Sequence, residues 1–299
     1  MLQSYDPRNA DIVYWVNGVL HHRDEPGLSP FDSVVQGGDA VWEGLRVYDG
    51  KVFALTEHLG RLRRSAQALA FSHIPSDADI AAAISATLRA NHMTDGVHIR
   101  LTLTRGVKIT SGMDPRLNTA RCTLIVLAEH KPPVYDSGGI TLITSSLRRP
   151  GPDVLDPKIH SNNLLNSILA KIEANVAGAD DAVMLDRRGF VAETNATHLF
   201  AVIDAGLVTP RAIACPEGIT RSTVLRLAAD AGLPYEVGDF PLTRLYSADE
   251  AFVTGTMGEL TPVLVVDGRT IGDGAPGPLT RKLSADYAAL TASSGTVVV

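Results

Sequence analysis

The chain has 299 residues, 45% of them hydrophobic, which is enough apolar material for more than one domain core. Its 27 basic and 33 acidic residues give a net charge of −6, with no basic cluster suited to a phosphate backbone, so we expect no nucleic-acid partner. Two cysteines and nine scattered histidines suggest neither a disulfide framework nor a metal site. The polar N-terminus and the short apolar runs predict a cytoplasmic protein that binds no membrane.

The first half of the chain alternates short strands with two helices. Apolar residues recur every three or four positions over residues 57–70, and again over 77–93 behind a polar capping pair. Segments rich in Val, Ile, Tyr and Thr predict strands at residues 12–16, 41–48, 52–54, 97–104 and 122–128. We therefore expect a small N-terminal domain, residues 1–130, built as a sheet with helices on one side.

Residues 131–139, with two prolines and two glycines, have no periodicity and are predicted to be an interdomain linker. A larger domain, residues 140–299, is expected to follow. Its predicted strands are residues 140–145, 182–185, 190–193, 199–203, 207–208, 251–253 and 263–266, and its helices 162–177, 220–231 and 278–290, with a frayed tail from 291. The fold class predicted is α+β with two domains.

A lysine and a glutamate stand out in this second half. Lys158 lies in a turn-rich stretch just before a predicted helix, where a lysine can be held inward. Taken by itself, this segment does not distinguish such a residue from an ordinary exposed lysine. Glu193 ends a predicted strand with apolar residues on both sides, so its carboxylate needs a partner.

Two further segments are rich in hydrogen-bond donors. Residues 216–220, PEGIT, lead into a helix whose free N–H groups and positive dipole end suit a phosphate. Residues 254–262, TGTMGELTP, form a second turn after a strand, with Gly and Thr able to offer N–H and hydroxyl donors. Each segment is weak evidence when it stands alone.

Together these four segments resemble the class IV aminotransferases, which are the fold type IV pyridoxal-phosphate enzymes. The resemblance also includes GDAVWEGLRVY at residues 38–48, EHLGRLRRSA at 57–66, TRG at 104–106 and GPLT at 277–280. It therefore extends over most of residues 11–290, and the order and spacing of the segments make it specific. It implies a D-amino-acid aminotransferase-like fold and a homodimer, because sites of this family are usually completed at a dimer interface.

The resemblance implies pyridoxal 5'-phosphate as cofactor and assigns roles to individual residues. Lys158 would be the catalytic residue that holds the cofactor, and Glu193 would lie against its pyridine nitrogen. The phosphate would be bound by Arg61, Ile219, Thr220 and Thr256. Without the resemblance, Arg61 suits the exposed face of an amphipathic helix equally well, and Thr220 could be a simple helix cap.

Gly44, Arg100, Thr256 and Met257 would line the substrate pocket by the same resemblance. A glycine after a strand is also a common bend, and Arg100 would equally suit a cross-strand ion pair. Aromatic residues typical of the branched-chain enzymes are replaced here by Gly37, by His98 and by either Asn163 or Leu164. The pocket is therefore not the standard one of that branch.

Residues 256–259 and 114–116 favour a branched-chain transaminase that moves an amino group between an L-amino acid and a 2-oxo acid such as 2-oxoglutarate. Residues 163–165, Asn-Leu-Leu, look more like the D-amino-acid branch. An (R)-amine transaminase and an aminodeoxychorismate lyase-like enzyme of the same fold also remain open. The sequence does not determine the amino donor, its stereochemistry or the pathway.

Two interpretations from other classes are less favoured. Residues 272–277 match G-x-G-x-x-G, but a proline lies inside the match and only 22 residues follow it, too few for a dinucleotide-binding unit. A non-catalytic domain that kept the fold is disfavoured because Lys158 and Glu193 are both present.

Overall fold

A computed structural model describes residues 4–135 and 138–299, and these form two compact units. The first unit comprises the described residues up to 132 together with 159–163 and 291–299. The second comprises the described residues within 133–158 and 164–290. The chain passes between the units within the expected linker, residues 131–139, of which 136–137 lie outside the described residues. Sequence periodicity gives no sign that 159–163 and 291–299 group with the first unit.

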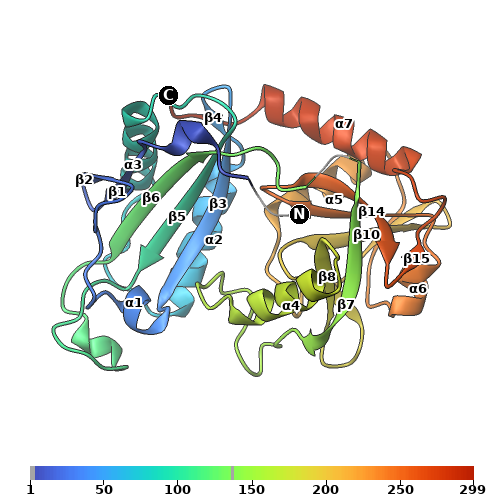
Figure 1. The fold of residues 1–299 in the computed structure, drawn as a ribbon, viewed down its shortest axis with the longest axis horizontal. Coiled ribbons are helices and arrows are strands. Elements are labelled where there is room, and N and C mark those ends of the chain that lie inside the picture. The colour runs from blue at the N-terminus through green and yellow to red at the C-terminus, as the bar shows by residue number, and fades with distance from the viewer. Residues whose placement is uncertain (1–3, 136–137) are drawn as a thin grey trace. The chain divides into compact units, whose positions relative to one another are not determined.

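The first unit contains a seven-stranded sheet in the order β16-β4-β3-β5-β6-β1-β2, with every neighbouring pair antiparallel (Figure 1). The strands are β1 (Val13–Val16), β2 (Val19–His22), β3 (Ala40–Tyr48), β4 (Lys51–Val52), β5 (Val97–Thr104), β6 (Thr123–His130) and β16 (Thr296–Val297). The tail expected to be frayed is therefore ordered in part, because β16 pairs with β4.

Helices cover one face of this sheet. They are α2 (Leu55–Ala68) and α3 (Asp77–Ala90), while α1 (Ser33–Gly37) and two single 3-10 turns, Pro7–Asn9 and Pro115–Leu117, complete the unit. The period-2 alternation of β3 directs Val41, Leu45 and Val47 into the apolar core that α2 and α3 share with the sheet. The opposite face of β3 consequently carries Trp42, Gly44 and Arg46. One strand thus contributes both to the core and to a polar face.

The second unit is built on a nine-stranded mixed sheet in the order β12-β11-β10-β13-β14-β7-β8-β9, with β15 paired to β14 (Figure 1). Its strands are β7 (Ile140–Arg148), β8 (Asp181–Leu185), β9 (Val191–Thr194), β10 (His198–Ile203), β11 (Gly206–Thr209), β12 (Tyr235–Val237), β13 (Glu250–Gly255), β14 (Glu259–Val266) and β15 (Arg269–Thr270). Three neighbouring pairs are parallel: β7 with β8, β7 with β14, and β11 with β12. The other pairs are antiparallel.

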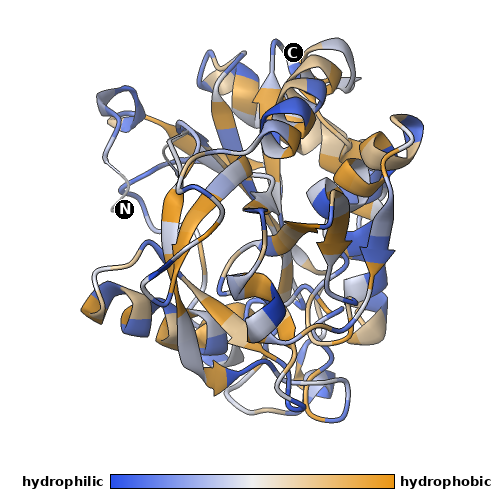
Figure 2. Cartoon of the chain, turned by 90° about the vertical axis from the view of Figure 1, so that its right-hand side faces the viewer, coloured by the Kyte–Doolittle hydropathy of each residue, from blue (hydrophilic) through white to orange (hydrophobic). Residues whose placement is uncertain are grey.

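Four helices complete the described chain: α4 (Leu165–Val176), α5 (Ile219–Asp230), α6 (Leu242–Tyr246) and α7 (Pro278–Ser293). Helix α4 begins three residues after the expected start at 162, so the segment from Lys158 to its first turn is non-helical. Strands are mostly hydrophobic, and hydrophilic residues are more frequent in loops and on outer helix faces (Figure 2). None of the helices in the described ranges is both long enough and apolar enough to cross a membrane.

Candidate active site

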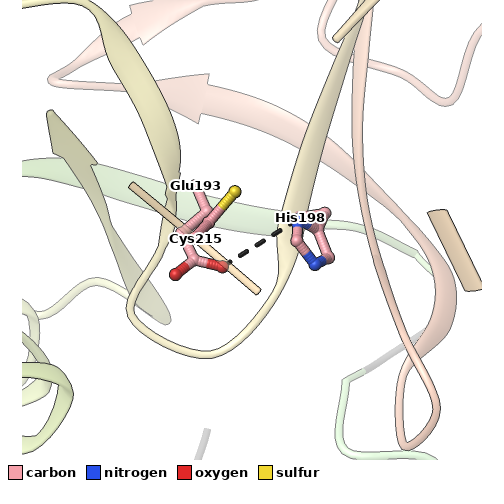
Figure 3. Close-up of side chains that lie close together, drawn as sticks. All are labelled: Glu193, His198 and Cys215. Atoms are coloured by element: carbon pink, nitrogen blue, oxygen red, sulfur yellow. Dashed lines mark ion pairs between the residues drawn. The ribbon is translucent and has the colours of Figure 1, made fainter. Parts of the chain in front are cut away.

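Three polar side chains meet inside the second unit (Figure 3). Glu193 lies on β9, His198 is the first residue of β10, and Cys215 lies in the loop before α5. Their exposed fractions are 3%, 9% and 0%, respectively. His198 Nδ1 lies 3.9 Å from Glu193 Oε2, and one donor atom from each of the three side chains lies within 4.8 Å of the others. Such donors can bind a metal ion, but a cation already occupies the carboxylate.

That cation is Arg149, which forms an ion pair with Glu193. The arginine follows β7, where its backbone N–H donates to the carbonyl of Leu185 at 2.9 Å and its side chain donates to Ser167 Oγ at 3.0 Å. Burial lowers the pKa of Arg149 to about 10. The partner that the sequence requires for Glu193 is therefore an arginine 44 residues earlier in the chain. Sequence reasoning misses it, because the β7-β8-β9 order that brings the two together has no local sequence signal.

The N-terminus of α5 lies directly against this cluster. Gly218 is its N-cap, no side chain caps the helix, and Thr220 is buried in its first turn. A Cβ atom on Gly218 would lie 2.2 Å from His198 Cδ2, so a glycine is required for this close approach. Ile219, the first helical residue, is half-buried. The helix end therefore presents its first backbone N–H groups beside the histidine.

The second donor-rich turn reaches the same end of β10. Strand β13 pairs with β10 so that Thr254 lies opposite His198. Thr254 Oγ1 is buried and has no hydrogen-bond partner among the described residues. Thr256 and Met257 follow in a turn, both half-buried, and the carbonyl of Met257 accepts the N–H of Val134 at 3.1 Å.

Lys158 lies in a turn, exposed, and its backbone N–H donates to Asp156 Oδ1 at 3.0 Å. Burial raises the pKa of the Cys215 thiol to about 11, and the positive charges of Arg221, Arg149 and Lys158 oppose that rise. Three of the four segments singled out in the sequence meet at this end of β10: the Glu193 strand, the N-terminus of α5 and the turn after β13. Lys158 is exposed, so the structure does not show it held inward as the sequence suggested.

Arg61 belongs to the first unit and faces inward from α2. Its Nε and Nη2 donate to Glu43 Oε1 and Oε2 at 2.9 and 2.6 Å, and His58 Nδ1 lies 2.6 Å from the same carboxylate. Burial alone would raise the pKa of Glu43, but the charge and hydrogen bonds of Arg61, with hydrogen bonds from His160 and His58, hold it well below its usual value. Arg61 is 8% exposed, so it is not a solvent-facing residue of an amphipathic helix.

Gly44 and Arg100 are direct cross-strand neighbours on β3 and β5. The guanidinium carbon of Arg100 lies 3.5 Å from the centroid of the Trp42 ring, and Nη2 donates to Asn162 Oδ1 at 3.0 Å. Burial lowers the pKa of Arg100 to about 10, against the charge of Glu43. The cross-strand neighbours of Arg100 are Gly44 and Leu127, both uncharged, so the alternative of a cross-strand ion pair is wrong.

Residues 40–266 match the family model described as amino-transferase class IV. The chain belongs to the class IV aminotransferase family. Branched-chain-amino-acid aminotransferase-like protein 2 of Arabidopsis thaliana is 55% identical over 97% of this chain and 52% of its own length. A putative branched-chain-amino-acid aminotransferase of Methanocaldococcus jannaschii is 41% identical over 91% of this chain and 94% of its length, and the D-alanine aminotransferase of Bacillus licheniformis 33% identical over 89% and 93%.

The chain spans about half the length of the plant relative. Among solved structures, the T.th. branched-chain amino acid aminotransferase, complexed with N-(5'-phosphopyridoxyl)-L-glutamate, superposes with a TM-score of 0.88 at 34% identity, over 95% of each chain. That of Thermobaculum terrenum, in its PLP form, reaches 0.85 at 29%, again over 95% of each. The expected fold type IV architecture, α+β with two sheets, is confirmed. These members of the family bind pyridoxal phosphate or a derivative of it.

The buried ion pair leads to a stability prediction. Arg149→Met removes one partner and leaves Glu193 as an uncompensated buried charge, so we expect a loss of about 3–5 kcal/mol of unfolding free energy in urea denaturation. The control is Arg188→Met, since Arg188 is half-exposed and pairs at the surface with Asp186 and Asp239. That variant should lose at most about 1 kcal/mol. Equal small losses in both variants would show that the Glu193 carboxylate does not depend on its arginine.

Proposed function

We propose that the protein is a pyridoxal-phosphate-dependent transaminase that moves an amino group between a branched-chain L-amino acid and a 2-oxo acid such as 2-oxoglutarate. The observation that carries the proposal is that three separate segments of the second unit meet beside His198. They are the strand of the buried Glu193, the uncapped N-terminus of α5 and the turn after β13. The Lys158 turn belongs to the same unit. Family membership and the named relatives support the same reaction class.

The donor groups of this unit fit pyridoxal phosphate. A helix N-terminus without a side-chain cap offers backbone N–H groups to a phosphate, and Ile219 and Thr220 provide them. The buried Thr254 hydroxyl lacks a partner among the described residues, as expected of a group that hydrogen-bonds a bound molecule. Thr256 is proposed as a further phosphate ligand by the family pattern. The same pattern proposes Arg61, which belongs to the first unit and there donates to Glu43. Glu193 offers a buried carboxylate to a ring nitrogen.

The proposed chemistry divides between the cofactor and two side chains. Pyridoxal phosphate, when bound, supplies an aromatic ring that accepts electrons. Lys158 would hold the cofactor through its amine and would move the proton at the α-carbon of the substrate. Glu193 would keep a proton on the ring nitrogen by its negative charge, and Arg149 forms an ion pair with that carboxylate.

The identity of the substrate is a separate part of the proposal. By the family pattern, its pocket is proposed to be lined by Gly44, Arg100, Thr256 and Met257. The protein is proposed to be a homodimer. The branched-chain choice follows relatives of that name, whereas a D-alanine aminotransferase at 33% identity keeps the D-amino-acid alternative open. An (R)-amine transaminase and an aminodeoxychorismate lyase-like enzyme are the remaining alternatives.

A panel of amino donors tests the reaction and its branch. With 2-oxoglutarate as acceptor, we expect glutamate to form from L-leucine, L-isoleucine and L-valine, and much more slowly from D-alanine or a primary (R)-amine. Glutamate formation is measured by chromatography, with boiled protein as the control. If D-alanine were turned over fastest, the protein would be a D-amino-acid transaminase, and if the amine were, an (R)-amine transaminase. Pyruvate release from aminodeoxychorismate without glutamate formation would instead indicate a lyase.

The role of Lys158 is tested by trapping. Borohydride reduction of the purified yellow protein should fix the cofactor to the peptide that contains residue 158, as read by mass spectrometry. Lys158→Arg keeps the positive charge and should abolish both the label and the transfer. Lys282→Arg, a change at an exposed lysine of α7, should leave both intact. A label on another lysine would reject the assignment.

Glu193→Gln keeps the shape of the side chain but removes its charge. We expect cofactor to remain bound while the transfer rate falls of the order of tenfold to a hundredfold, equivalent to about 1–3 kcal/mol. The measurement is single-turnover absorbance, with cofactor content determined separately. Glu236→Gln, which changes an exposed glutamate paired with Arg244, is the matched control. An unchanged rate in the Glu193 variant would contradict its role.

A further inference from the structure

The segment that directly follows Lys158, residues 159–163, is fastened to β3. It belongs to the first unit, whereas Lys158 is the last residue of the second unit before the chain crosses into this segment. The backbone N–H of Trp42 donates to the carbonyl of His160 at 3.0 Å, and its indole Nε1 donates to the carbonyl of Ser161 at 3.1 Å. A single residue of β3 therefore holds the chain immediately after the lysine by two hydrogen bonds.

The side chain of His160 is the centre of this attachment. It is 15% exposed, its ring stacks on the Trp42 ring with 4.3 Å between centroids, and its Nδ1 lies 2.6 Å from the Trp42 carbonyl oxygen. Because a carbonyl only accepts, Nδ1 must carry the proton of this hydrogen bond. The backbone N–H of His160 also donates to Ser65 Oγ on α2 at 3.1 Å. The residue is thus joined to both the strand and the helix.

The charges beside His160 favour its neutral form. Burial, and then the positive charge of Arg61, lower the pKa of His160, and Glu43 opposes that change with its hydrogen bond and its charge. Nδ1 lies 3.6 Å from Glu43 Oε1. A neutral imidazole leaves the charge balance of the Glu43–Arg61 pair unchanged, so its contribution here is a matter of geometry.

The backbone of Lys158 is held from both sides. Its N–H donates to Asp156 Oδ1 at 3.0 Å, and two residues further on the chain is fixed at His160. Two residues span at most about 7 Å, so a shift of His160 moves the Cα atom from which the lysine amine extends. A misplacement of about 1 Å at a reacting group can cost on the order of 100-fold in rate.

We infer that His160 is a positioning residue for Lys158: through its stacking and its Nδ1 hydrogen bond with Trp42, it fixes the backbone from which the lysine amine reaches the cofactor. The inference rests on the proposed function in one respect, namely that Lys158 holds pyridoxal phosphate. In this role His160 acts through the backbone and needs no contact with the cofactor.

The test compares the binding of two cofactor forms to the full chain by equilibrium dialysis and absorbance. Pyridoxal phosphate carries the aldehyde that bonds to a lysine, whereas pyridoxamine phosphate binds by noncovalent contacts alone. His160→Ala removes both side-chain contacts with Trp42. We expect it to bind pyridoxal phosphate about 10- to 100-fold more weakly, equivalent to about 1.4–2.8 kcal/mol, and pyridoxamine phosphate within about threefold of the wild type. His160→Asn retains an N–H donor close to the position of Nδ1, so it should bind pyridoxal phosphate within about fivefold of the wild type.

His130→Ala is the matched control, because it removes a half-buried imidazole from β6 of the same unit and should leave both affinities unchanged. If circular dichroism shows His160→Ala to be unfolded, His160→Phe takes its place with the same selective loss expected, since it keeps a ring but lacks the donor. Equal weakening of both cofactor forms would assign His160 to the Glu43–Arg61 pair and overturn the inference. No weakening of either form, or an Asn variant no better than the Ala variant, would also overturn it.

Borohydride trapping separates the failure of this inference from that of the proposed function. If the wild type is labelled at Lys158 and His160→Ala binds pyridoxal phosphate as tightly as the wild type does, this inference alone is rejected. A label at another lysine would reject the proposed role of Lys158, and this inference with it.

Discussion

The ion pair between Glu193 and Arg149 is the interaction on which the proposed active site depends. A carboxylate that is 3% exposed would be strongly destabilising without a counter-charge, and Arg149, which follows β7, provides it. Because Arg149 is also fixed by Leu185 and Ser167, the acid is held on a rigid part of the sheet rather than on a loop. A buried, paired carboxylate can remain charged, as a partner for a protonated ring nitrogen must.

The first unit also contains a buried carboxylate that is neutralised by an arginine, in the pair of Glu43 and Arg61. Glu43 and Arg61 join β3 to α2 on the side of the sheet that faces the apolar core, and His58 Nδ1 lies within hydrogen-bond distance of the same carboxylate. Alternation along β3 then places Trp42 and Gly44 on the opposite face. The same nine-residue strand therefore ties a helix to the sheet and presents the proposed substrate face, so a change at Glu43 would disturb both.

The sequence predicts the elements and the family better than the contacts. Strands such as β3 and β5, with clear alternation, and helices with an apolar stripe are recognisable because their patterns are local. Arg149, the partner of Glu193, cannot be recognised from a local pattern, because the contact depends on the parallel pairing of β7 with β8. The two-residue strand β16 is too short for any period to appear. The candidate site residues are identified by their resemblance to family motifs, and their catalytic and binding roles are proposals.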